Sequence, residues 1–68
     1  MRTFQGLEGA TVMVNLTTGD ALAGRVTRVG RDHLDLTEAR LQSREHSGPL
    51  DGAVIIPAER VAWIQVVS

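Results

Sequence analysis

The sequence predicts an all-β protein, a small and strongly bent five-stranded barrel with a short helical turn at its N-terminus. Three observations predict this fold. Apolar and polar residues alternate over residues 11–16, as in a strand buried on one face. A polar turn at residues 17–20 then leads into a second β-rich segment that contains Gly24. Near the C-terminus, residues 54–64 hold two short runs that are apolar on both faces and flank a turn.

Size and composition favour a single domain that gains stability from partner chains. The chain has 68 residues, near the lower limit for a domain without crosslinks, and it has no cysteine. Hydrophobic residues make up 43%, but Phe4 and Trp63 are the only aromatic ones, so the core must be aliphatic. We therefore predict one domain over residues 1–68, with burial against partners as a further source of stability.

Charge and patterning exclude several functional classes. The formal net charge is −1, so we expect no general attraction to nucleic acid or to an anionic membrane. No run is long and apolar enough to span a membrane, and residues 1–6 lack the apolar stretch of a signal peptide. These features predict a cytoplasmic protein without a membrane partner. All seven cations are arginine, which suits interfaces and bidentate contacts to phosphate or carboxylate.

The sequence shows no constellation of catalytic or metal-binding residues. Serine, histidine and acidic residues do not fall on rigid elements at a spacing typical of nucleophilic catalysis, and no glycine-rich phosphate loop opens a helix. Glu45 and His46 lie in a long loop without a second fixed ligand nearby. The sequence therefore predicts no enzyme, no cofactor and no metal site.

The N-terminal half predicts a helical turn followed by two strands. The turn covers residues 3–8, with Thr3 as its N-cap and Gly9 beyond its end. The first strand covers residues 11–16, and Gly19 supplies the positive φ of the turn that follows it.

The second strand, residues 21–29, carries an anomaly in its alternation. Leu22, Gly24 and Val26 share one parity, whereas Val29 has the other. If both valines point inward, the strand must change phase between Gly24 and Arg28, through a bulge or a strong bend. Gly24 itself is predicted to be a packing glycine on a curved strand.

The C-terminal half predicts three more strands and one long loop. Leu34 and Leu36 alternate with polar neighbours in a third strand, and residues 39–53 form a long variable hairpin loop. Residues 54–57 and 61–67 are the last two strands, joined by a tight link at residues 58–60. Pro57 cannot donate a ladder hydrogen bond, so it must close the fourth strand. The pattern is typical of a Greek-key-like or SH3-like barrel.

These segments resemble the Sm-like family, which includes the Sm and LSm proteins and Hfq, as a divergent small bacterial or phage-type member. The first motif of the family spaces its apolar residues and glycines as in Leu16, Gly19, Gly24 and Val26. The second motif is matched in length and apolar positions by residues 54–64. The resemblance covers residues 4–67 and implies a ring of six or seven identical subunits that holds RNA or single-stranded nucleic acid.

The departures from the family pattern concern its RNA pocket. The Arg-Gly pair of the second motif is replaced by Pro57-Ala58, which removes a guanidinium and a flexible backbone donor. The first RNA-binding loop reads Gly30 through Asp35 and lacks the asparagine of the family, and the Tyr-Lys-His signature of Hfq is absent. The resemblance therefore predicts the fold and the ring assembly of this chain more securely than it predicts an RNA pocket.

Two sets of candidate residues follow. The arginines of the second strand and its turn can form a stripe that holds phosphates, or a solvated face paired with Asp20, Asp32 or Glu38. His33 can stack on a base, and Asp35 can accept a hydrogen bond from one, or His33 is a plain turn histidine. The predicted nucleic-acid-binding residues are Arg28, Arg31, His33, Asp35 and Arg60.

The second set is a subunit interface on the last two strands. The parity of the last strand places Val61, Trp63, Gln65 and Val67 on one side, so one apolar row stays exposed unless a neighbour covers it. The resemblance implies that the fourth strand of one subunit pairs with the fifth of the next. The predicted interface residues are Ile55, Val61, Trp63, Ile64 and Val66.

Two hypotheses remain open on the sequence alone. The first is an Sm-like ring that binds RNA or single-stranded nucleic acid, which the resemblance favours. The second is the same ring used as a structural or adaptor part, for example of a phage particle, which the near-neutral charge, Pro57-Ala58 and the long loop favour. A monomeric SH3-like peptide-binding module is disfavoured, because such grooves need several aromatic residues.

Overall fold

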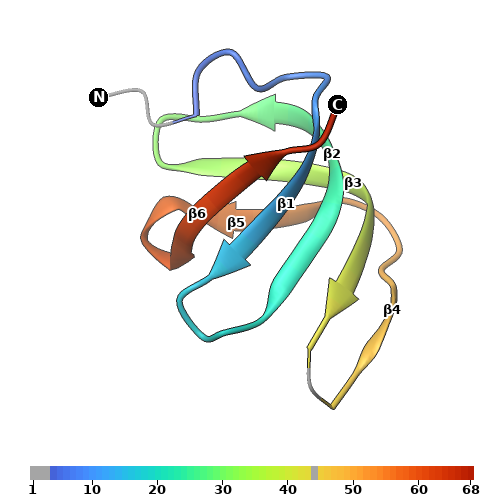
Figure 1. Ribbon diagram of the computed structural model, residues 1–68. Coiled ribbons are helices and arrows are strands. Elements are labelled where there is room, and N and C mark those ends of the chain that lie inside the picture. Colours follow the sequence, from blue (N-terminus) through green and yellow to red (C-terminus); the bar gives the residue numbers. More distant parts are fainter. Residues whose placement is uncertain (1–3, 44) are drawn as a thin grey trace.

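The computed structural model describes residues 4–43 and 45–68 and shows an all-β fold. Its elements are β1 (Thr11–Leu16), β2 (Ala21–Val29), β3 (His33–Gln42), β4 (Ser47–Pro49), β5 (Val54–Pro57), the 3-10 helix η1 (Ala58–Arg60) and β6 (Val61–Val66) (Figure 1). They form one antiparallel sheet in the order β4-β3-β2-β1-β6, and β5 also pairs with β3. The sheet thus has six strands rather than the five predicted.

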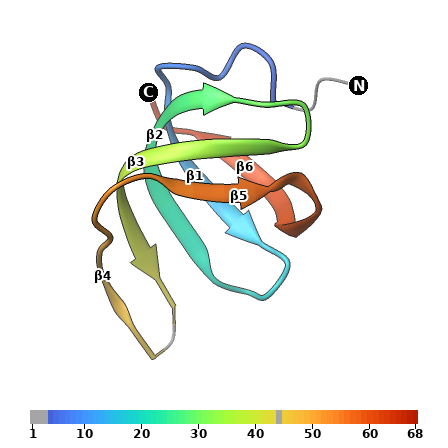
Figure 2. The same ribbon diagram turned by 180° about the vertical axis from the view of Figure 1, so that it is seen from behind.

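The sheet is strongly bent, so that β6 lies on one side of the core and β5 on the other. β6 crosses in front of β1 in Figure 1, and β5 comes forward beside β3 when the molecule is seen from behind in Figure 2. Among the described strands, β6 pairs with β1 and β5 pairs with β3, and these two strands do not pair with each other. The sheet is therefore open between β5 and β6.

The core is aliphatic, as the composition predicts. Val12 and Val14 of β1 are fully buried, and Leu34 and Leu36 of β3 are buried with them. Phe4 is also buried, which makes it the one aromatic residue among the described core residues. The complete buried set is Phe4, Val12, Val14, Leu22, Val26, Leu34, Leu36, Ala39 and Ile56.

Two register breaks between β2 and β3 produce the bend, and the predicted phase change on β2 is confirmed. The pairing shifts between Ala23 and Arg25 and again between Val26 and Arg28. Gly24 is buried, and a Cβ added there would lie 3.1 Å from the carbonyl oxygen of Thr37 and 3.2 Å from the Cα of Ala39. The close approach of β3 therefore favours a glycine at this position, because a larger residue would push the β3 backbone away by a few tenths of an ångström.

The region predicted as a loop, residues 39–53, is partly strand. β3 continues to Gln42, where its last three residues pair with β4, and this hairpin extends away from the body of the fold (Figure 1). The alternation of apolar and polar residues does not reveal that β3 continues past residue 38. Glu38 has a positive φ of 53° and forms a bulge, which breaks the alternation. Buried side chains therefore change from even positions, such as Leu36, to the odd position of Ala39.

The N-terminal segment folds as turns and not as the predicted helical turn. The amide of Leu7 donates to the carbonyl of Phe4 at 3.3 Å, and Gly6 then takes a φ of 91°, which a helix cannot continue through. The predicted N-cap, Thr3, lies outside the described residues. No helix in the described ranges has the length and apolar character needed to cross a membrane.

Candidate functional site

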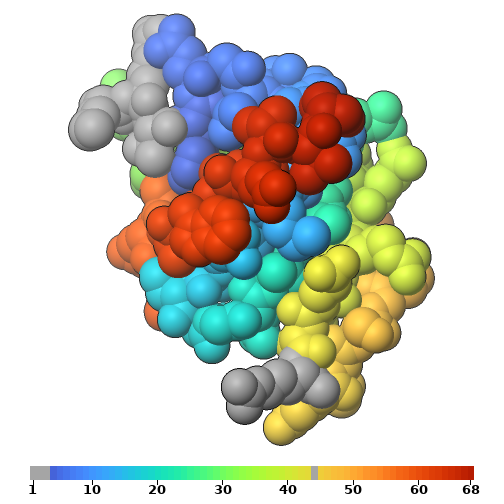
Figure 3. All heavy atoms as spheres, in the orientation of Figure 1, coloured from blue at the N-terminus to red at the C-terminus, as the bar shows by residue number. Residues whose placement is uncertain are grey.

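Large apolar side chains are exposed on β6 and just beyond its end. Trp63 is 58% exposed and Val66 is 55% exposed, and Val67 just beyond the strand is 61% exposed. In the space-filling view of Figure 3, this C-terminal segment lies uncovered across the front face. A groove of about 350 Å³ runs along it, lined by Phe4, Leu7, Ala58, Val61, Ala62, Trp63, Ile64 and Val66. None of these lining residues is charged, so we name this uncharged surface the β6 groove.

The predicted alternation of side chains between the two faces of β6 is wrong at the start of the strand, because the strand contains a bulge. Trp63 pairs with Asn15 and Val61 pairs with Leu16, so Ala62 is an extra residue between them. The bulge turns Val61 to the side of Ile64, and both pack half-buried against the core. Of the five predicted interface residues, Ile55, Trp63 and Val66 are thus exposed, whereas Val61 and Ile64 are partly covered within the subunit.

Part of the groove was missed by reasoning from the sequence. Phe4 and Leu7 come from the N-terminal turns and line the β6 groove from the side. The signal was weak, because an apolar residue in a short irregular segment has no periodicity that reveals which surface it joins.

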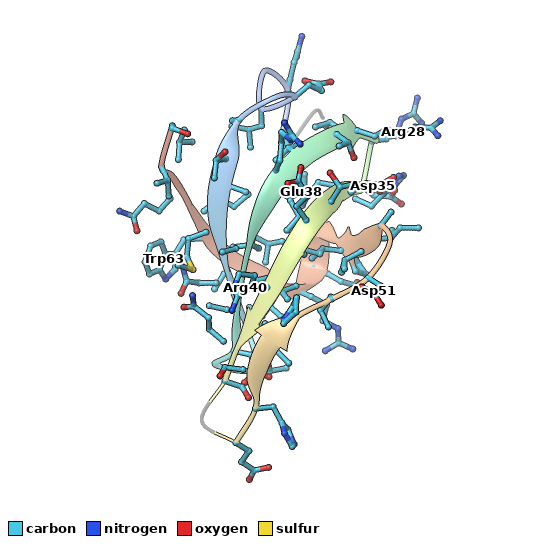
Figure 4. All side chains as sticks on the ribbon, turned by 90° about the vertical axis from the view of Figure 1, so that its right-hand side faces the viewer. Arg28, Asp35, Glu38, Arg40, Asp51 and Trp63 are labelled. Carbon is cyan, nitrogen blue, oxygen red and sulfur yellow. The ribbon has the colours of Figure 1, made fainter. Side chains whose placement is uncertain are left out.

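A second group of candidate residues lies where the β2–β3 turn meets η1. The amide of Ala58 donates to the carbonyl of Asp32 at 2.7 Å, and His33 pairs with Pro57 across the strands. This backbone contact brings together the two segments in which the resemblance drawn from the sequence predicts RNA binding. Arg28 and Asp35 are partners in the β2–β3 register and lie at the same end of the molecule, far from Trp63 (Figure 4).

One predicted nucleic-acid-binding arginine, Arg60, and one arginine of the predicted stripe, Arg25, differ from the prediction. Arg60 lies at the far end of η1, where its carbonyl accepts a hydrogen bond from the amide of Thr17 at 2.8 Å, so its backbone lies beside the β1–β2 turn. Arg25 is an ion-pair partner of Glu38, as the alternative interpretation predicts. Arg28 and Arg31 are exposed and form no ion pair within residues 4–43 and 45–68.

His33 has a fixed place between two carboxylates. Its Nδ1 lies 3.1 Å from Asp32 Oδ1, and its Nε2 lies 3.8 Å from Asp35 Oδ1. The imidazole packs directly on Gly30, where an added Cβ would overlap the ring. A glycine at this point of the turn therefore lets the ring lie between the two acids.

The hydrogen bond from His33 lowers the pKa of Asp32 below its ordinary value, and the charges of His33 and Arg31 add to the effect. Because the folded pKa lies below the unfolded one, the interaction stabilises the fold at pH above that ordinary value of about 3.9. The stabilisation disappears as the pH falls through the lowered folded pKa.

We predict that Asp32→Asn removes this acid-sensitive contribution. Between about pH 5 and pH 2, the wild type should lose more stability than Asp32→Asn, as measured by urea unfolding at each pH. The difference should be small and should shrink with salt, because Asp32 is exposed. Asp51→Asn changes another exposed aspartate and is the control; equal pH dependence in wild type and Asp32→Asn would contradict the prediction.

Comparison with known proteins shows similarity at the level of structure. No family model matches the chain, and no curated protein matches it. One similar chain comes from the crystal structure of the NatC complex bound to CoA, with 24% identity over 97% of this chain and 86% of that chain and a TM-score of 0.80. Another comes from the NatC complex bound to Gag peptide and CoA, with 25% identity over 94% and 90% and a TM-score of 0.79.

These similarities correct one prediction. The sequence predicts no enzyme because it shows no catalytic constellation, whereas both similar chains are part of a complex crystallised with bound CoA. The exclusion is therefore wrong, since a chain of this fold can belong to an enzyme-related assembly. A search for catalytic residues within one chain cannot detect a role that depends on other chains.

Proposed function

We propose that this chain is an Sm-like subunit that joins identical copies into a ring through β5 and β6. The single observation that carries the proposal is the pair of exposed apolar strands at the open ends of the sheet. Ile55 on β5 is 65% exposed and Trp63 on β6 is 58% exposed, and each strand lacks a partner on its outer edge among the described residues. Addition of β5 to the β6 of a neighbour would cover both.

The shape of the sheet supports this mode of assembly. The register breaks between Ala23 and Arg25 and between Val26 and Arg28 curve the sheet as in a small barrel, and strands of neighbouring copies would pair with the open edges of β5 and β6. Because β5 and β6 are different surfaces, the contact is head-to-tail and continues until a ring closes. The resemblance to Sm-like proteins favours six or seven copies.

The mass of the assembly in solution tests the proposal. Sedimentation of the wild-type chain over a dilution series should give one species of six or seven times the 7.3 kDa chain mass. Association driven by apolar burial should persist at high salt. A 7.3 kDa species at every concentration would exclude the ring.

A second proposed function is binding of RNA or single-stranded nucleic acid at the end that carries His33. The observation that favours it is the exposure of Arg28 and Arg31, whose guanidinium groups have no ion-pair partner within the described residues. Asp32 and Asp35 at the same end oppose phosphate, so the attraction must come from several copies acting together.

We predict that Arg28→Ala and Arg31→Ala each weaken oligonucleotide binding. Fluorescence anisotropy with labelled single-stranded RNA should show that binding weakens with salt, and this salt dependence should be shallower by about one unit of slope for each phosphate that a variant no longer neutralises. Arg25→Ala is the matched control, since Arg25 is engaged by Glu38. Wild-type rings with no affinity at low salt would exclude this function and leave a structural or adaptor ring.

A further inference from the structure

His33 is placed to respond to pH. The chain has two histidines, His33 and His46, and histidine is the side chain whose ordinary titration falls between about pH 5 and 8. Its Nδ1 lies within hydrogen-bond distance of Asp32, so the neutral ring carries its proton there and presents a bare Nε2 to Asp35. Protonation adds an N–H at Nε2, which faces the Asp35 carboxylate.

Asp35 is the group that would accept a hydrogen bond from this N–H. Its side chain is 16% exposed, and its Oδ1 atom is buried without a hydrogen-bond partner among the described residues. A buried acceptor that lacks a partner destabilises any state in which it is further removed from water. Asp35 would therefore gain most from a protonated His33 when its remaining exposure to solvent is removed.

The proposed assembly would remove that exposure. Asp35 and Ile55 are direct partners in the β3–β5 register, so their side chains lie on the same face of the sheet. A neighbouring copy that covers the exposed Ile55 would also cover the face on which Asp35 lies. Burial of the carboxylate would then favour the protonated imidazole, which offers Asp35 a charge-assisted hydrogen bond.

We propose that protonation of His33 strengthens the association of copies through β5, which makes the assembly tighter near pH 6 than near pH 8. This inference rests on the proposed ring. The other charged groups on the elements around the imidazole are Arg31 in the turn, Arg28 on β2 opposite Asp35, and Glu59 on η1, whereas Arg60 lies at the far end of η1. Within the described residues, the imidazole forms ion pairs with Asp32 and Asp35 alone.

Dilution experiments at two pH values test the inference. Sedimentation at about pH 6 and about pH 8, at one ionic strength, should show wild-type subunits associating about tenfold more tightly at the lower pH, the value of one charge-assisted hydrogen bond. His33→Phe keeps a ring on Gly30 but cannot be protonated, so it should associate at both pH values as weakly as wild type does at the higher pH. His46→Phe is the matched control and should keep the wild-type difference.

Asp35→Asn is an independent second variant, whose expected strength of association is opposite to that of His33→Phe. It removes the charge that opposes burial, so it should associate tightly at both pH values and show no pH dependence. A pH difference that persists in His33→Phe, or a wild-type ring equally stable at both pH values, would overturn the inference and leave the ring intact. Monomers at both pH values would overturn the ring and the inference together.

Discussion

Leu36→Ala should leave much of the protein unfolded at room temperature. Leu36 is fully buried and lies between Val26 of β2 and Val54 of β5 in the register, so truncation opens a cavity where three strands meet. Such substitutions cost about 2–5 kcal/mol. A core of this size supplies about 3–5 kcal/mol of stability, so the loss is comparable to the whole free energy of unfolding.

Urea unfolding followed by circular dichroism measures this effect. It should be done at the lowest practicable concentration, because association would add to the apparent stability of the wild type. Ile55→Ala is the control, since Ile55 is 65% exposed and its truncation should change the monomer by no more than about 0.5 kcal/mol. A loss below about 1 kcal/mol for Leu36→Ala would show that the site can collapse around the smaller side chain.

The same core shows which parts of the fold can be predicted from sequence. Strands with uninterrupted alternation, such as β1 with Val12 and Val14, are confirmed at both ends. The phase change between Val26 and Val29 is also confirmed, because a phase change inside an apolar pattern has few explanations other than a bulge. In both cases the sequence pattern that predicts the feature lies within a single strand.

Prediction from sequence fails for features that are determined by pairing with another strand. β4 consists of Ser47, Gly48 and Pro49, which have low strand propensity, and it forms because β3 offers an edge to pair with. The bulge at Ala62, which turns Val61 inward, likewise depends on the register with Leu16 of β1. Neither feature has a local pattern in the sequence.

The candidate site divides in the same way. Exposure of Ile55, Trp63 and Val66 follows from strands that are apolar on both faces. By contrast, the burial of the Oδ1 atom of Asp35 and the packing of His33 on Gly30 are set by how the turn and the strands fold together. The sequence places these residues in one segment but gives no information about which atoms face each other.

The largest expected effect on assembly comes from a charge placed on either exposed strand. Trp63→Glu and Ile55→Glu should each reduce the ring to monomers, because a carboxylate would be buried without a partner in every subunit contact. Both side chains are exposed in the single chain, so circular dichroism and urea unfolding should show a folded monomer. Sedimentation measures the fall in mass.

Mixing the two variants tests the head-to-tail geometry itself. Trp63→Glu keeps an intact β5 and Ile55→Glu keeps an intact β6, so one sound contact can form between one molecule of each kind. An equimolar mixture should therefore give a dimer of twice the 7.3 kDa chain mass and no ring, because the two remaining strands of the pair both carry a charge. If copies instead joined β6 to β6, Ile55→Glu alone would still associate and the mixture would form no new species. That result would contradict the pairing of β5 with β6.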